Sequence, residues 1–96
     1  MPFQTNTYTG LLHLDGPKSY LVTKDGIGNP VFTLMMLYNA PTAAFNWASV
    51  AAARNHFIQR GLIEGSPLRL SGFLTNEDVY QTGALQPVLH ILQDLG

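Results

Sequence analysis

The stretch that decides the fold runs from Phe45 to Leu92. It reads FNWASVAAARNHFIQR over 45–60, PLRLSGFL over 67–74 and PVLHIL over 87–92. Within it, the segment Ala52–Leu62 places apolar side chains on one side of a helix and most polar ones on the other. The apolar side holds Ala53, Phe57, Ile58 and Leu62, and the polar side holds Arg54, Asn55, Gln59 and Arg60. Because Gly61 and Gly65 end this pattern, the sequence predicts one helix followed by a turn.

Strands are predicted after this helix. In one of them, a core face alternates with an outer face, which is typical of a half-buried strand. The core face consists of Leu68, Leu70, Gly72 and Leu74, and the outer face of Arg69, Ser71, Phe73 and Thr75. The polar segment Thr75–Pro87 predicts a loop or hairpin tip, and the apolar run Val88–Leu92 predicts the last strand.

Three strands are predicted before the helix. The segments Thr7–Leu14 and Ser19–Thr23 are rich in strand-forming residues, and Lys24–Pro30 has the glycines of a hairpin loop. The third segment, Val31–Tyr38, is apolar on both of its faces and is therefore expected to be buried on both. One face would fill the core, and the other would meet a partner subunit, the helix or a ligand.

The segment Phe45–Ala51 is compatible with two structures. Its alanines favour the beginning of a long helix. It could equally continue the sheet, since its periodicity does not decide between the two. In a strand, Trp47 and Ser49 would point away from Ala48 and Val50, onto an outer face.

The order of these elements predicts the fold class. A helix inserted among the strands of a small, mostly β chain is typical of an OB-fold. We therefore expect an all-β (small α+β) fold, a five-stranded OB-fold barrel with one α-helix between strands 3 and 4. A chain of 96 residues fits a single domain over 1–96.

The composition restricts the partners. Charged residues make up 11% of the chain, well below the usual ~25%, so apolar surface is expected to be covered in a homodimer or higher assembly. The net charge of −1 argues against strongly electrostatic nucleic-acid binding, but not against binding by stacking. The absence of cysteine excludes disulfides and thiolate metal sites. There is no apolar run long enough for a membrane span and no secretory signal pattern, so we expect a cytoplasmic protein without membrane partners.

The C-terminal half resembles the bacterial single-stranded DNA-binding protein family, including its primosomal replication protein B branch. The resemblance rests on the order and spacing of Trp47, Arg60-Gly61, Gly65-Ser66, Leu68–Leu74, Tyr80, Gly83 and Val88–Ile91. The N-terminal half matches this family in pattern through Gly10-Leu11, a hairpin with glycines and Val31–Leu34. This resemblance implies binding of single-stranded DNA in replication, recombination or mobile-element transfer. The chain departs from the family in having five basic residues and in carrying Glu77 and Asp78 in the hairpin.

Aromatic residues are the first candidates for a binding surface. An exposed Trp47 ring could stack on a base, and Tyr38 and Tyr80, expected at a strand end and a loop tip, could extend the stacking surface. Phe73 would either stack on a base or pack in a subunit interface. For each of these residues the alternative is an ordinary packing role, such as a buried indole or a tyrosine with only its hydroxyl in water.

Basic residues are the second candidates. Lys18, Lys24 and Arg69 are expected next to the second strand and on the outer face of the fourth, where they could contact phosphates. Arg54 and Arg60 are expected on the solvent side of the helix. With so few cations, the predicted salt dependence of binding to single strands is shallow, at about −0.7 per phosphate contact.

The sequence offers no pattern for catalysis or for a cofactor. His13, His56 and His90 have no metal-ligand spacing, although His13 and His90 could meet if the first and last strands were neighbours. The carboxylates lie in or beside expected turns, which does not indicate a catalytic pair. We therefore expect no enzyme activity, no metal and no cofactor. The expected function is non-enzymatic binding of single-stranded DNA, and the alternative is an OB-fold module for protein–protein assembly without nucleic acid.

Overall fold

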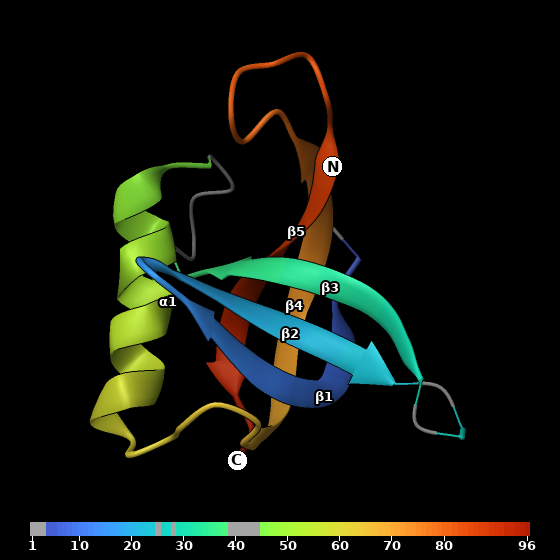
Figure 1. The fold of residues 1–96 in the computed structure, drawn as a ribbon, viewed down its shortest axis with the longest axis vertical. Helices are drawn as coiled ribbons and strands as arrows, with labels where there is room; N and C mark the ends of the chain where they lie inside the picture. Colours follow the sequence, from blue (N-terminus) through green and yellow to red (C-terminus); the bar gives the residue numbers. More distant parts are fainter. Residues whose placement is uncertain (1–3, 25, 28, 39–44) are drawn as a thin grey trace.

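The computed structural model describes residues 4–24, 26–27, 29–38 and 45–96. The chain forms a mostly β structure in which one helix lies beside a curved sheet (Figure 1). The elements are β1 (Asn6–Asp15), β2 (Lys18–Lys24), β3 (Pro30–Leu37), α1 (Trp47–Gln59), β4 (Pro67–Glu77) and β5 (Gln86–Asp94).

The five strands close into a barrel in the order β1-β2-β3-β5-β4. All neighbouring pairs are antiparallel except β3 and β5, which run parallel over Met35–Leu37 and Val88–His90. The helix lies between β3 and β4 in the chain. This topology confirms the predicted five-stranded barrel with one helix and is consistent with an OB-fold.

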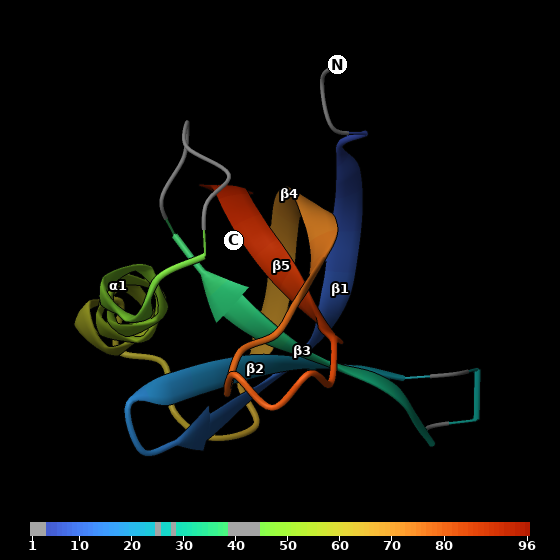
Figure 2. The same ribbon diagram turned by 90° about the horizontal axis from the view of Figure 1, so that it is seen from above.

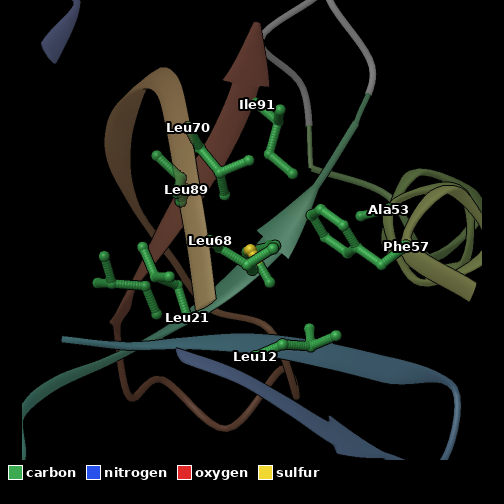
Figure 3. Packing of buried hydrophobic residues seen from close by; sticks show 10 residues of the cluster. Leu12, Leu21, Ala53, Phe57, Leu68, Leu70, Leu89 and Ile91 are labelled. Atoms are coloured by element: carbon green, nitrogen blue, oxygen red, sulfur yellow. The ribbon is translucent and has the colours of Figure 1, made fainter. Parts of the chain in front are cut away.

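All five strands contribute leucines to the interior of the barrel, and β3 does so from its second half only. The helix α1 covers one end of this interior. Leu12, Leu21, Leu70, Leu89 and Ile91 are almost completely buried. Figure 3 shows Phe57 pointing from α1 toward these side chains. The apolar side of the helix was predicted with one error, because Ile58 is 43% exposed.

The outer face of β3 is covered by the chain itself over part of its length. Met35 and Leu37 pack outside the barrel against Val50 of α1 and Val79 of the β4–β5 loop. The prediction that β3 is buried on both faces is therefore correct for its second half. It is wrong for the first half, where Val31 and Phe32 are exposed.

Two glycines allow the strands to close the barrel. A Cβ atom on Gly10 would lie 2.4 Å from the carbonyl oxygen of Val22, and one on Gly72 would lie 2.2 Å from that of His90. No heavy atoms approach so closely without displacement of the backbone, so both strand crossings require the absence of a side chain.

The β4–β5 hairpin is longer than the sequence predicts. Pairing continues through Thr75↔Val88 and Asn76↔Pro87 to Glu77↔Gln86. The predicted loop Thr75–Pro87 is therefore reduced to residues 78–85. The polar side chains that suggested a loop lie on a strand whose outer side reaches solvent.

Candidate binding surface

The first turn of α1 determines where the only tryptophan lies. Asn46 has extended backbone angles (φ −156°, ψ 156°), and its Oδ1 accepts hydrogen bonds from the backbone N–H (2.8 Å) and hydroxyl (2.9 Å) of Ser49. This is the geometry of a helix N-cap. The open question about Phe45–Ala51 is thus answered, since the helix begins at Trp47 and no strand continues there.

Trp47 is 44% exposed. The expectation of an indole on the face of a strand is corrected, because the ring projects from a helix. It is nevertheless open to solvent, whereas Ser49 and Val50 of the same helical turn are buried.

Trp47 and four further rings form a continuous surface, which we call the aromatic row. It comprises Phe45, Trp47, Tyr80, Tyr20 and His13, together with the amine of Lys18. The centroids of Phe45 and Trp47 are 5.5 Å apart, and those of Trp47 and Tyr80 are 5.9 Å apart. At the other end, Tyr20 and His13 are 5.8 Å apart. These distances are within the range of direct ring–ring contact.

Lys18 joins the two ends of the aromatic row. Its Nζ donates a hydrogen bond of 3.1 Å to the hydroxyl of Tyr80 and lies 5.6 Å and 5.7 Å from the ring centroids of Tyr80 and Tyr20. It also lies 3.5 Å from the carboxylate of Asp15. The amine is therefore held between two phenols and is hydrogen-bonded to one of them.

These contacts shift the pKa values of the three groups. The hydrogen bond to Tyr80 raises the pKa of Lys18, and the same bond lowers the pKa of Tyr80. Burial, with the hydrogen bond to Tyr80, raises the pKa of Tyr20. Lys18 is therefore a stable cation at neutral pH, and Tyr20 beside it is a neutral hydrogen-bonding group.

The β4–β5 loop is fastened where it carries Tyr80. The carboxylate of Asp78 accepts the backbone N–H of Thr82 and of Gly83, each at 2.9 Å. Val79 is buried against the outer face of β3. The next residue, Tyr80, is 50% exposed. The loop thus presents Tyr80 beside Lys18 at the β1–β2 turn. In OB-folds, these two loops and the strand face between them form the surface that binds oligonucleotides and oligosaccharides.

Three of the seven predicted site residues come together in this surface, namely Trp47, Tyr80 and Lys18. Tyr38 does not join them. It packs against the core cluster and meets the ring of His56 edge-on, with centroids 5.2 Å apart.

Phe73 lies on the predicted outer side of β4 but is buried, with 8% of its surface exposed. Its ring is stacked on that of His90 in β5, with centroids 4.6 Å apart and planes 10° from parallel. The expectation that Phe73 contacts a base or a subunit is corrected, because a ring this covered is part of the packing between β4 and β5.

The two remaining cations lie elsewhere. Lys24 ends β2, seven residues along the strand from Lys18 counting both ends, a span of about 20 Å. Arg69 is exposed on β4 opposite Thr9. Neither residue belongs to the aromatic row.

The sequence analysis missed Phe45, Tyr20 and His13. Tyr20 could have been found, because it lies two positions after Lys18 in a strand and so shares its face. His13 is paired with Tyr20 in the β1–β2 ladder, which depends on the register of that hairpin. Phe45 precedes the helix cap, and its place depends on the chain's path before α1.

Two carboxylates outside the aromatic row, Asp94 and Glu64, are engaged in structural contacts. Asp94 at the end of β5 accepts hydrogen bonds from His56 (2.8 Å) and from Arg60. Burial opposes the ionisation of Asp94, but these hydrogen bonds outweigh it and lower its pKa. Glu64 accepts the backbone N–H of Leu14 at 2.7 Å, which with a contact to His13 lowers its pKa. These contacts fasten α1 and the turn after it to the barrel.

His90 is buried between the outer faces of β4 and β5. Its Nε2 lies 2.7 Å from the hydroxyl of Thr75, and burial lowers its pKa. His13 and His90 lie on β1 and β5, which are not neighbours in the barrel, so the two histidines do not meet. Across the described ranges, no three His, Cys, Asp or Glu side chains are grouped closely enough to hold a metal ion.

No protein-family model, curated protein or solved structure matches this chain. Among the described residues, no helix has the length and apolar character needed to cross a membrane.

Proposed function

We propose that the aromatic row binds single-stranded DNA, without enzymatic activity. The observation that supports this most strongly is the exposure of Trp47 and Tyr80 in contact with each other, since Tyr80 lies on one of the loops that OB-folds use for ligands. Large rings are costly to leave in water, and unpaired bases are flat partners that stack on them for about 1–3 kcal/mol each. Every base has such a face, so the binding is expected to be largely independent of sequence.

Electrostatics makes a small contribution in this proposal. Lys18 is the single lysine or arginine in the aromatic row, and Asp15 lies 3.5 Å from its amine. One or two phosphate contacts predict a slope of log K against log salt between about −0.7 and −1.4. The proposed cellular setting is replication, recombination or mobile-element transfer.

The test is a titration of the protein with oligothymidine of ~15 nucleotides at low salt, a length at the upper end of OB-fold sites. Trp47 is the only tryptophan, so quenching of its fluorescence reports directly on the row. Anisotropy of a labelled oligonucleotide measures the affinity independently and extends the test to variants without the indole.

The variant Trp47→Ala is expected to weaken binding by about 1–3 kcal/mol, which is the value of one stacked base. The matched control is Ile63→Ala, which removes an apolar side chain with 71% exposure outside the row. The control is expected to bind like the original protein. Equal affinity for all three proteins would show that DNA uses another surface.

A protein that leaves the oligonucleotide unbound at about 100 µM, the weak end of non-specific affinities, would contradict the proposal. The assembly-module alternative would then be the better explanation of the exposed rings.

A further inference from the structure

A second exposed surface lies on the hairpin formed by β2 and β3. Figures 1 and 2 both show this hairpin extending beyond the rest of the barrel. The exposed large apolar side chains here are Ile27 (85%), Phe32 (59%), Val31 (50%) and, from β4, Leu74 (41%). The aromatic row shares no residue with them, so they are not explained by the proposed function.

An apolar groove adjoins these side chains. Phe32 and Leu34 of β3 line it together with Tyr8, Thr23, Leu74 and Pro87, and its volume is about 150 Å³. None of these six residues is an Asp, Glu, Lys, Arg or His. An apolar cavity of about this size is large enough to hold benzene, so the groove can accommodate one apolar side chain.

The first half of β3 also has an open edge. The ladder with β5 begins at Met35, whereas the ladder with β2 extends back to Pro30. Among the described residues, therefore, no strand pairs with positions 31–34 on the side away from β2. A strand edge of this kind pairs readily with another strand.

The hydrogen bonds of Phe32 show which backbone groups face this edge. The N–H of Phe32 donates to Thr23 Oγ1 (3.0 Å), and its carbonyl accepts from the same hydroxyl (3.5 Å), so both groups of Phe32 point toward β2. Successive residues of a strand point their backbone groups in opposite directions. The N–H and carbonyl groups of Val31 and Thr33 therefore point to the open edge.

We propose that this edge is a homodimer interface in which β3 pairs antiparallel with β3 of a second copy around a two-fold axis at Phe32. In this register, Val31 of each copy exchanges hydrogen bonds with Thr33 of the other. Pro30 lacks an N–H and β5 occupies the edge from Met35 onward, so this register uses the two open positions between them. The two Phe32 side chains stand directly opposite each other, next to both grooves.

A second copy fits this surface better than a charged partner. Identical surfaces bring identical charges together, and the groove has no charged lining to create repulsion. Taking the ~150–250 Å² of an aromatic side chain as an approximation for each of the four, their exposed parts present roughly 350–600 Å² per copy. That is about half or more of the ~800 Å² per partner of a standard interface, and the paired strand edges add to it.

Sedimentation equilibrium of the full chain between about 1 and 100 µM tests the proposal, since interfaces of ordinary size dissociate at micromolar concentrations or below. The original protein is expected at twice the 10.5 kDa of one chain. Phe32→Lys is expected to raise the dissociation midpoint about tenfold or more, because it places two charges opposite each other. Ile63→Lys, which changes another exposed apolar residue (71%, against 59% for Phe32), is expected to leave the midpoint unchanged. Circular dichroism confirms that each variant is folded.

A cysteine variant tests the register. The chain has no cysteine, so Phe32→Cys introduces the only thiol. In the proposed register, the two copies of residue 32 form a non-hydrogen-bonded pair. The Cα atoms of such a pair are about 4.5 Å apart, which is within the range of disulfides, ~4.4–6.8 Å. Mild oxidation is expected to link Phe32→Cys into a covalent dimer much faster than Ile63→Cys.

Two results would overturn the proposal. One is a monomer for the original protein across the whole concentration range. The other is a dimer that persists in Phe32→Lys while Phe32→Cys crosslinks no faster than Ile63→Cys. If Phe32→Lys is unfolded, the relative crosslinking rates decide alone.

Discussion

At the scale of single residues, the aromatic row depends on Lys18 and Tyr80. The amine donates to a phenol on a loop more than sixty positions away in the chain, so one hydrogen bond fixes the distance between the β1–β2 turn and the β4–β5 loop. Removing the hydroxyl while keeping the ring separates the two roles of Tyr80, namely holding the loop and stacking on a ligand.

We predict that Tyr80→Phe keeps most of the affinity for oligothymidine, whereas Tyr80→Ala loses about 1–3 kcal/mol, because stacking needs the ring and not its hydroxyl. Anisotropy titrations of both variants under the same salt conditions check this. Equal losses in both would mean that the hydrogen bond to Lys18, not the ring, carries the contribution of Tyr80.

His90 is the residue through which we expect stability to depend on pH near neutrality. Burial holds its pKa below the ordinary value of about 6.5. The unfolded chain therefore binds a proton at a pH where the folded chain does not. The contribution of His90 to the free energy of unfolding is complete above the pKa that His90 has in the unfolded chain, and it is lost as the pH falls below that pKa.

We predict a smaller free energy of unfolding at pH 5.5 than at pH 7.5, with a contribution from His90 of at most about 1.4 kcal/mol per pH unit. Urea unfolding at the two pH values measures it. His90→Gln is expected to reduce the difference, while the lowered pKa values of Glu64 and Asp94 act in a more acidic range. An unchanged difference in His90→Gln would assign the pH dependence to other groups.

At the scale of elements, the cap of α1 decides the position of the indole. The sequence left Phe45–Ala51 open because alanines suit a helix and the apolar pattern suits either structure. The decisive residue is Asn46, whose side chain satisfies the backbone of Ser49. Asparagine three positions before serine is a weak signal in a sequence, and only the hydrogen bond makes it decisive.

We predict that Asn46→Ala lowers stability by about 1 kcal/mol and that Asn46→Asp keeps it, since aspartate is an equally good N-cap. Thermal and urea unfolding measure both. If the Asn46→Ala variant has unchanged stability, the packing of Val50 and Phe57 holds the first turn without the cap.

At the scale of the whole molecule, the sequence predicts the order of the elements because alternation and helical periodicity are local properties. It predicts Trp47, Tyr80 and Lys18 as members of a site but does not show that they touch. Phe73 could not be placed correctly, because its burial depends on His90, which is seventeen positions away and stacked on it across the β4–β5 pair. Contacts between distant strands depend on register, which single-residue patterns do not determine.

Barrel closure should be sensitive to one methyl group. We predict that Gly10→Ala lowers stability by about 1–3 kcal/mol or more, since its Cβ would collide with backbone that has no room to move. Gly26→Ala is the control, because a Cβ there meets nothing within 4 Å and is expected to change stability by less than about 0.5 kcal/mol. Comparable melting temperatures for the two variants would show that the barrel relaxes at the β1–β2 crossing.

Because Lys18 lies between two phenols, its rate of acylation can report on movement of the β4–β5 loop. The protein has two lysines, and acylating reagents attack only the uncharged amine. Lys18 is kept charged and its side chain is 20% exposed, whereas Lys24 is open to solvent. Mass spectrometry should therefore find acylation of Lys24 first. The rate at Lys18 then becomes a measure of how often the β4–β5 loop lifts away from the turn beneath it.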